Sequence, residues 1–179
     1  MLELCLVILR MITESLGMKK HYDSLVENTS SVLRLMKYRV APPSSDSVQL
    51  GLVAHTDKSA LTILCQNQVQ GLELLTKQGN WIQVKLPEAS FIVFVGDALK
   101  AWSNGRLHAA THRVMLKGDK ERYSCGVFLV PKEEVTIEVP QELIDKDHPL
   151  LYRPFKFSDY FSYFVSNITD DALELYAGL

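Results

Sequence analysis

The tripeptide His55-Thr56-Asp57 follows an apolar run and places an imidazole and a carboxylate two positions apart. In an extended chain, residues i and i+2 point to the same side, so both side chains would face one point. That geometry suits a metal ion, although an H-x-D tripeptide alone is a weak signal because such short patterns arise by chance. A metal site here requires a third ligand from elsewhere in the chain.

Two later histidines, His108 and His112, lie four residues apart and compete for that role. His112 opens a β-like stretch, whereas His108 lies in a loop-like segment. A zinc pair on one helix face is disfavoured because no acid of the HExxH type lies between them and the segment contains poor helix formers. We therefore predict His112 as the third ligand and His108 as a surface or supporting residue. Two imidazoles and one carboxylate leave three positions of an iron ion open, as oxygen chemistry with a co-substrate requires.

The segment Arg122-Tyr123-Ser124 begins a predicted strand ten residues after His112. Arg122 and Ser124 would share one face, and a guanidinium beside a hydroxyl suits a carboxylate. Arg-x-Ser is common in proteins, so its position relative to His112 gives it weight. On an earlier strand, Tyr38 could offer its phenol to the same ligand; a half-buried sheet tyrosine is an equally good interpretation.

Together with Asn104-Gly105-Arg106 and His112-Arg113-Val114, these motifs resemble the plant-type 2-oxoglutarate and iron(II)-dependent dioxygenases. The resemblance implies that iron binds to His55, Asp57 and His112. It also implies that the distal carboxylate of 2-oxoglutarate is held by Arg122, Ser124 and Tyr38. Met36 stands where the family frequently has an asparagine that contacts the co-substrate.

The sequence at Leu35–Arg39 and Asp145–Pro149 is similar to that of the AOP-like subgroup, whose members modify glucosinolate side chains. The resemblance implies oxidation, expected as hydroxylation, of a small plant metabolite in secondary metabolism. Fe(II) would be the cofactor, 2-oxoglutarate and O2 the co-substrates, and ascorbate an additional reductant. Succinate and CO2 would be released.

Turn residues separate many short candidate strands that have no helices between them, which favours an antiparallel sandwich or jelly roll. The resemblance specifies a mainly β double-stranded β-helix (jelly roll) with flanking helices. The predicted strands are Ser31–Val40, Val48–Ala54, Ala60–Gln66, Gly71–Thr76, Trp81–Lys85, Phe91–Val95, His112–Leu116, Arg122–Val130 and Val135–Val139. The turn-rich Pro42–Ser47 would end the first of them.

Three regions are predicted: an amino-terminal helical remnant at 1–29, the dioxygenase domain at 30–131, and a carboxy-terminal strand and helical tail at 132–179. The first helix is indicated by leucines and isoleucines at spacings of three and four from Leu2, ended by Gly17. Because this pattern starts at the first residues, we expect an upstream part. In the family that part closes the jelly roll, so its absence would expose apolar surface and sheet edges.

Three other features receive structural interpretations. Asp97 is predicted to be a turn residue and Trp102 a packing residue. The aromatic residues Phe157, Tyr160, Phe161 and Phe164 recur at helical spacing and are predicted to pack in the core, and Asp170 could cap a last turn.

Composition excludes several classes of partner. Nineteen basic and 21 acidic residues give a net charge of −2, too balanced for a nucleic-acid surface or an anionic membrane. The apolar run at the amino terminus is short and interrupted by charges, so it predicts no membrane span. Three cysteines without a CxxC pair favour a reducing compartment, and we expect a cytoplasmic protein acting on a small molecule.

Two alternatives remain open. One is a cupin-like metalloenzyme that uses the same three ligands without 2-oxoglutarate. The other is a truncated, catalytically inactive relative that acts as a binding module or is an unstable fragment.

Overall fold

The computed structural model describes residues 1–39 and 48–179. Its helices are α1 (Leu2–Ser15), α2 (Tyr22–Glu27), α3 (Asp97–Trp102), α4 (Phe157–Ser166) and α5 (Ala172–Ala177), with 3-10 turns at Lys19–His21 and Gln141–Leu143. Its strands are β1 (Thr29–Tyr38), β2 (Gln49–His55), β3 (Leu61–Gln66), β4 (Leu72–Leu75), β5 (Trp81–Gln83), β6 (Ile92–Val95), β7 (His112–Leu116), β8 (Arg122–Pro131), β9 (Thr136–Ile137) and β10 (Phe155–Lys156). The turn predicted at Pro42–Ser47 and the predicted strand end at Val40 lie outside the described residues.

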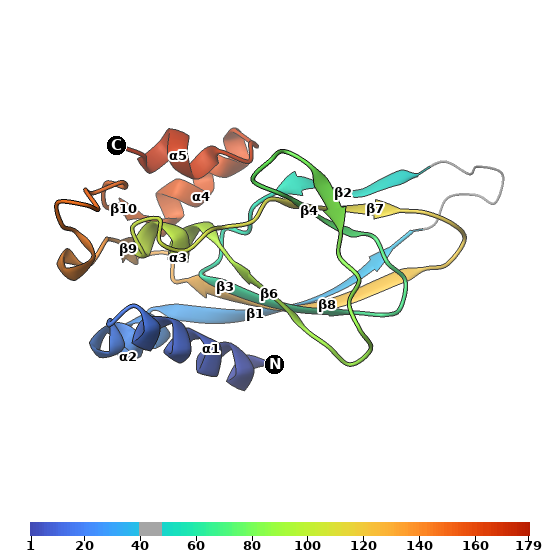
Figure 1. The fold of residues 1–179 in the computed structure, drawn as a ribbon, viewed down its shortest axis with the longest axis horizontal. Coiled ribbons are helices and arrows are strands. Elements are labelled where there is room, and N and C mark those ends of the chain that lie inside the picture. Colours follow the sequence, from blue (N-terminus) through green and yellow to red (C-terminus); the bar gives the residue numbers. More distant parts are fainter. Residues whose placement is uncertain (40–47) are drawn as a thin grey trace.

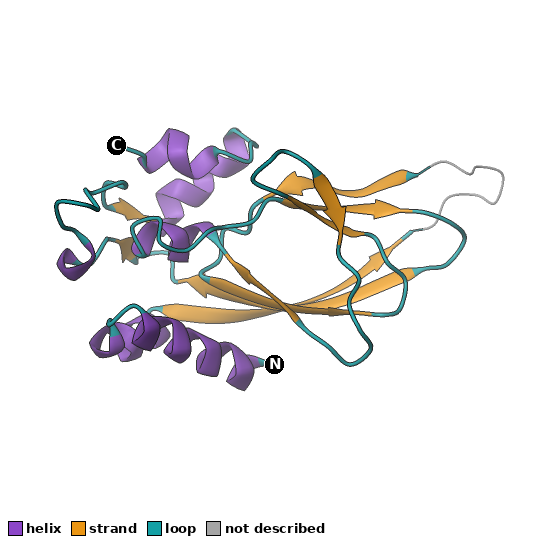
Figure 2. Cartoon of the chain, in the orientation of Figure 1, coloured by secondary structure: helices purple, strands orange, loops and turns teal. Residues whose placement is uncertain are grey.

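Two four-stranded antiparallel sheets face each other and form the body of the molecule (Figure 1). One has the order β1-β8-β3-β6, and the other has the order β2-β7-β4-β5. The helices gather at one end and along one face of this pair of sheets, as Figure 2 shows. The predicted mainly β fold with two antiparallel sheets and flanking helices is confirmed.

Every predicted strand is present, with ends that differ from the prediction by at most two residues within the described chain. Alternation explains the accuracy. In β8, Arg122, Ser124 and Gly126 point to the interior between the sheets, whereas Val127 and Leu129 fall in register with Ile63 and Leu61 of β3. Period-two patterning of this kind fixes both the strand and the face that it presents.

Helix α1 covers part of the outer face of the β1-β8-β3-β6 sheet. Cys5 and Leu9 are fully buried and belong to the same apolar cluster as Leu61 and Leu129. Gly17 follows the helix with a φ of 72°, a left-handed conformation that is easily adopted only by glycine. The predicted helix and its glycine end are therefore confirmed.

The carboxy-terminal tail packs against the end of the sheets that carries α3. Tyr160 and Phe157 of α4 are buried, as predicted, but Phe161 is 45% exposed and does not belong to the core. The last helix begins at Ala172 with Asp171 at the capping position, so the cap predicted at Asp170 is wrong by one residue. A backbone bridge between Tyr152 and Gly178 fixes the end of the chain.

Asn104-Gly105-Arg106 has a structural role. Asn104 and Gly105 both have positive φ, 52° and 73°, and turn the chain after α3. The Asn104 amide donates to the carbonyls of Leu143 and Pro149, at 3.3 and 3.1 Å, and its oxygen accepts the Leu151 N–H at 2.8 Å. These bonds attach the segment that leads to β7 to the tail.

None of the helices in the described part of the chain is both long and apolar enough to cross a membrane.

Candidate functional site

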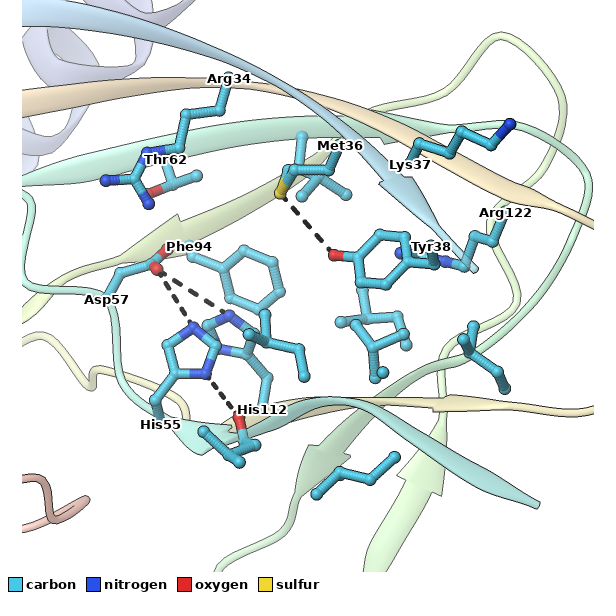
Figure 3. A pocket seen from close by; sticks show the side chains of 18 of the residues that line it. Arg34, Met36, Lys37, Tyr38, His55, Asp57, Thr62, Phe94, His112 and Arg122 are labelled. Carbon is cyan, nitrogen blue, oxygen red and sulfur yellow. Dashed lines mark hydrogen bonds and ion pairs between the residues drawn. The ribbon is translucent and has the colours of Figure 1, made fainter. Parts of the chain in front are cut away.

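Three ligand-type side chains meet where the two strands β2 and β7 begin their pairing. His55 ends β2 and His112 opens β7, and the two residues are direct cross-strand partners. Asp57 follows two residues after His55, on the loop toward β3. Donor atoms of the three side chains lie within 4.8 Å of one another, and Figure 3 shows both rings directed at the Asp57 carboxylate. The structure therefore brings together the three predicted metal ligands.

Backbone carbonyls fix the tautomers of both imidazoles. The Nδ1 atom of His55 lies 2.8 Å from the carbonyl oxygen of Val53, and that of His112 lies 3.0 Å from the carbonyl oxygen of Ala110. A carbonyl can only accept, so each Nδ1 carries the proton and each Nε2 has a free lone pair. These Nε2 atoms lie 3.8 and 3.9 Å from Asp57 Oδ1.

Two further observations show that the donor set fits a divalent metal ion. Asp57 Oδ2 is buried and has no hydrogen-bond partner, a costly state unless a bound ligand satisfies it. Burial is the main cause that lowers the pKa of His112, which favours the neutral, coordinating form. The His112 ring also stacks on Phe94, with ring centroids 4.3 Å apart, which fixes its orientation.

The three ligand-type side chains line a cavity with a volume of about 870 Å³, and Arg122 lines the same cavity. Its side chain is 1% exposed, yet its Nε and Nη1 atoms have no partner, and Nη2 donates to Gln66 Oε1 at 2.6 Å. Burial is the main cause that lowers its pKa, but the guanidinium stays charged at any physiological pH. A buried cation with two free donor atoms is costly unless a bound acceptor satisfies them, and a carboxylate would supply both the hydrogen bonds and the opposite charge.

Tyr38 and Ser124 flank this cation differently. The Tyr38 ring covers the guanidinium at 4.6 Å, while its hydroxyl donates to Met36 Sδ at 3.7 Å. Ser124 shares the inner face of β8 with Arg122 and has a buried Oγ without a partner, but it does not line the cavity that contains the three ligands. The predicted residues are therefore grouped at one end of the β8 strand, with Arg122 and Tyr38 in the cavity and Ser124 beside it.

A second cavity of about 800 Å³ reaches two of these side chains, His55 and Asp57, from the side of α4. Arg34, His55, Asp57, Phe128 and Phe164 line both cavities. Phe164 packs against the core and also forms cavity wall, whereas Phe161 lies outside the core and forms cavity wall alone. Cavity space therefore adjoins all three side chains on the Arg122 side and adjoins His55 and Asp57 on the α4 side.

Among the other residues near the site, one prediction agrees with the structure, one residue was not predicted and one was predicted wrongly. His108 is exposed and lines neither of these two cavities, in agreement with the choice of His112. Gln66, which holds Arg122, was missed because glutamine at a strand end has no distinctive signal. Asp97 was predicted to be a turn residue; it is instead the buried first residue of α3.

Residues 29–131 match the family model of the 2OG-Fe(II) oxygenase superfamily. The match covers more than half of the chain, which therefore belongs to that superfamily. It is 47% identical over 166 residues to the probable 2-oxoglutarate-dependent dioxygenase AOP1 of Arabidopsis thaliana, with 92% of this chain and 55% of the relative covered. A second Arabidopsis relative, AOP1.2, is 44% identical and covers 99% of this chain. The chain spans little more than half the length of these curated relatives.

Solved structures agree with this assignment. The crystal structure of JOX2 in complex with 2OG, Fe and JA has a TM-score of 0.80 at 34% identity, over 90% of this chain and 48% of that one. The rice dioxygenase for auxin oxidation has a TM-score of 0.78 at 33% identity, over 96% of this chain and 60% of that one. The expected resemblance to 2-oxoglutarate-dependent dioxygenases of the AOP type is confirmed.

Proposed function

We propose that this chain carries the catalytic centre of a 2-oxoglutarate- and Fe(II)-dependent dioxygenase that oxidises a small organic molecule of plant metabolism. One observation carries the proposal: a buried guanidinium with two partnerless nitrogen atoms and a group of two imidazoles and a carboxylate line the same cavity. A metal-binding group alone would fit many enzymes. The additional anion site is what a dicarboxylate co-substrate needs.

The proposed roles follow from the donor atoms. His55 and His112 offer Nε2 and Asp57 offers its carboxylate to iron, all from one side, so the cavity side stays open. Arg122, supported by Gln66, binds the far carboxylate of 2-oxoglutarate. We assign Ser124, on the same face of β8, and Tyr38, whose ring lies over Arg122, as further groups for this carboxylate. Iron bound there would support oxidative decarboxylation of 2-oxoglutarate to succinate and CO2, coupled to oxidation of a substrate C–H bond.

The residues of this chain orient the metal ligands, bind the co-substrate and exclude water from the site. Phe94 fixes the plane of the His112 ring, and the carbonyls of Val53 and Ala110 fix the protonation of the two imidazoles. The Tyr38 ring shields the Arg122 guanidinium from water, which strengthens its attraction for a carboxylate. The α4 side of the site offers an aromatic wall to an apolar substrate, and we expect hydroxylation as the reaction.

Succinate release tests the proposal. The purified chain is incubated with Fe(II), 2-oxoglutarate and ascorbate, with and without a panel of small carboxylic acids and plant metabolites. We expect succinate formation that depends on Fe(II) and is lost in Asp57→Ala.

Two results would contradict the proposal and identify the alternatives. Turnover supported by another metal without 2-oxoglutarate would indicate a cupin-like metalloenzyme. A broad melt that neither metal nor 2-oxoglutarate shifts would indicate an inactive binding module or fragment, since a ligand that binds only the native state must raise its stability.

A further inference from the structure

A buried polar cluster lies directly behind the three metal-ligand side chains. Asp97, at the first turn of α3, is 2% exposed, and three donors converge on its Oδ2 atom. The Lys58 ammonium lies at 2.6 Å, the Tyr160 hydroxyl at 2.6 Å and the Thr56 hydroxyl at 3.0 Å. The cluster therefore joins the loop after β2, helix α3 and helix α4.

Such a cluster is costly unless every member is satisfied. Removing a carboxylate and an ammonium from water costs several kcal/mol for each ion, and an ion pair recovers this only with good geometry and further hydrogen bonds. Here Lys58 also donates to Thr56 at 2.8 Å and lies over the Phe164 ring at 4.3 Å. Burial and the neighbouring Asp97 raise the pKa of Tyr160, so its hydroxyl stays protonated and donates at any accessible pH.

The cluster holds the main chain on both sides of Asp57. Thr56 and Lys58 are the neighbours of this residue in sequence, and both bond to the Asp97 carboxylate. The Asp97 N–H also donates to the Asp57 carbonyl at 2.7 Å. Asp57 is thus fixed through three points of its own backbone neighbourhood, although its carboxylate takes no part in the cluster.

Gly96 permits this close approach. A Cβ at Gly96 would lie 2.0 Å from the Ser59 carbonyl oxygen and 2.9 Å from the Asp57 carbonyl oxygen, both of which are backbone atoms. Any other residue would push the loop away from α3. The sequence therefore keeps α3 in direct contact with the loop that carries Asp57.

We propose that Asp97, with Lys58, Thr56 and Tyr160, is a positioning cluster that holds the Asp57 carboxylate in the orientation required for metal binding. The inference rests on the proposed function, in which Asp57 is a metal ligand. Tyr160 comes from α4, the helix that also supplies the aromatic wall of the second cavity. The cluster therefore fixes the position of Asp57 relative to this wall. Groups that orient metal ligands without touching the metal typically contribute 10–100-fold to affinity.

The test is a titration of the metal-free protein with Co(II) under anaerobic conditions, followed by absorption in the visible range. A second titration with Fe(II) is followed by calorimetry, because Fe(II) with these ligands has no useful visible absorption. We expect Tyr160→Phe to raise the Kd for Co(II) about tenfold, because the Asp97 carboxylate loses one of three donors. Tyr152→Phe is the matched control: this buried tyrosine also donates to a carboxylate of the tail, Glu174 Oε1, at 3.2 Å. Its Kd should stay within twofold of the wild-type value.

Melting temperatures measured without metal separate positioning from general stability. Both tyrosine variants should lower the melting temperature, and only Tyr160→Phe should also reduce the increase that Co(II) produces. If Tyr160→Phe precipitates, Thr56→Val removes another donor from the same carboxylate at nearly equal volume and gives the same measurement.

Equal Co(II) affinity in wild type and Tyr160→Phe would overturn the positioning role and leave the proposed function intact. A wild-type chain that binds neither Co(II) nor Fe(II) would instead overturn the proposed function itself.

Discussion

Arg122 is the residue that separates a dicarboxylate-dependent oxygenase from a general metalloenzyme. Truncating one partner of a buried charge pair costs about 2–5 kcal/mol. We therefore expect Arg122→Ala to raise the KM for 2-oxoglutarate at least tenfold, measured by succinate release over a range of co-substrate concentrations.

Arg113→Ala is the matched control for Arg122. Arg113 lies on the other sheet, where its Nε donates to Glu73 Oε2 at 2.8 Å. It does not line the cavity that contains Arg122 and the three metal ligands. It should leave the KM for 2-oxoglutarate unchanged. An unchanged value in Arg122→Ala as well would exclude Arg122 from co-substrate binding.

The two histidines that compete for the third ligand position provide a second pair of variants. We expect His112→Ala to abolish the increase in melting temperature that Mn(II) produces, because one of three ligands is lost. His108→Ala should retain the increase, since His108 is exposed and outside the cavity. The reverse result would assign the metal site to His108.

At the residue scale, sequence reasoning succeeded where a chemical group and its strand position coincide. His55, Asp57 and His112 could be predicted because strand alternation fixes the direction of a side chain. Gln66, Lys58 and Tyr160 could not, because their roles depend on which elements pack together. A buried ion pair such as that of Lys58 with Asp97 has no pattern in the sequence.

At the element scale, the turn after α3 illustrates the same limit. Its Asn-Gly motif was useful as part of a resemblance, but its physical role is to satisfy three backbone groups of the tail. The strands were predictable from their own alternation and turn residues. The short strand β10 and helix α3 were not, because each is formed mainly by contacts between distant segments.

We expect Asn104→Ala to lower the free energy of unfolding by about 1–3 kcal/mol, because the Pro149 carbonyl and the Leu151 N–H lose their partners in part-buried bonds and a left-handed backbone conformation must be kept by alanine. Urea denaturation measures the change. Asn167→Ala is the control: its amide also bonds to a carbonyl, that of Tyr163, but on the exposed surface of α4. A loss of less than 0.5 kcal/mol is expected there, and equal losses in both variants would contradict the structural role of Asn104.

At the scale of the whole molecule, the outer face of the β1-β8-β3-β6 sheet is only partly covered by α1. Leu35 is 77% exposed on β1, which is an edge strand among the described residues, and Leu33, Phe91 and Val93 add exposed apolar side chains in the same region. Exposed apolar edges favour aggregation.

We expect Leu35→Lys to raise the concentration at which light scattering detects aggregates, with little change in melting temperature. Leu175→Lys on α5 is the control, since Leu175 is 63% exposed but lies away from this sheet. Both variants change the net charge from −2 to −1, which by itself would reduce solubility. An equal response of the two variants would show that the sheet face is not responsible.

The bridge between Tyr152 and Gly178 affects residues that lie far upstream in the sequence. The Arg153 N–H donates to the Ala177 carbonyl and the Leu179 N–H to the Leu151 carbonyl, so the final residues are paired in the manner of a strand. Tyr176 in this last helix packs on Tyr160, with ring centroids 5.6 Å apart. Deleting only the last eight residues would therefore remove the packing partner of the Tyr160 ring, whose hydroxyl donates to Asp97. The loss would reach Asp57, more than a hundred positions upstream.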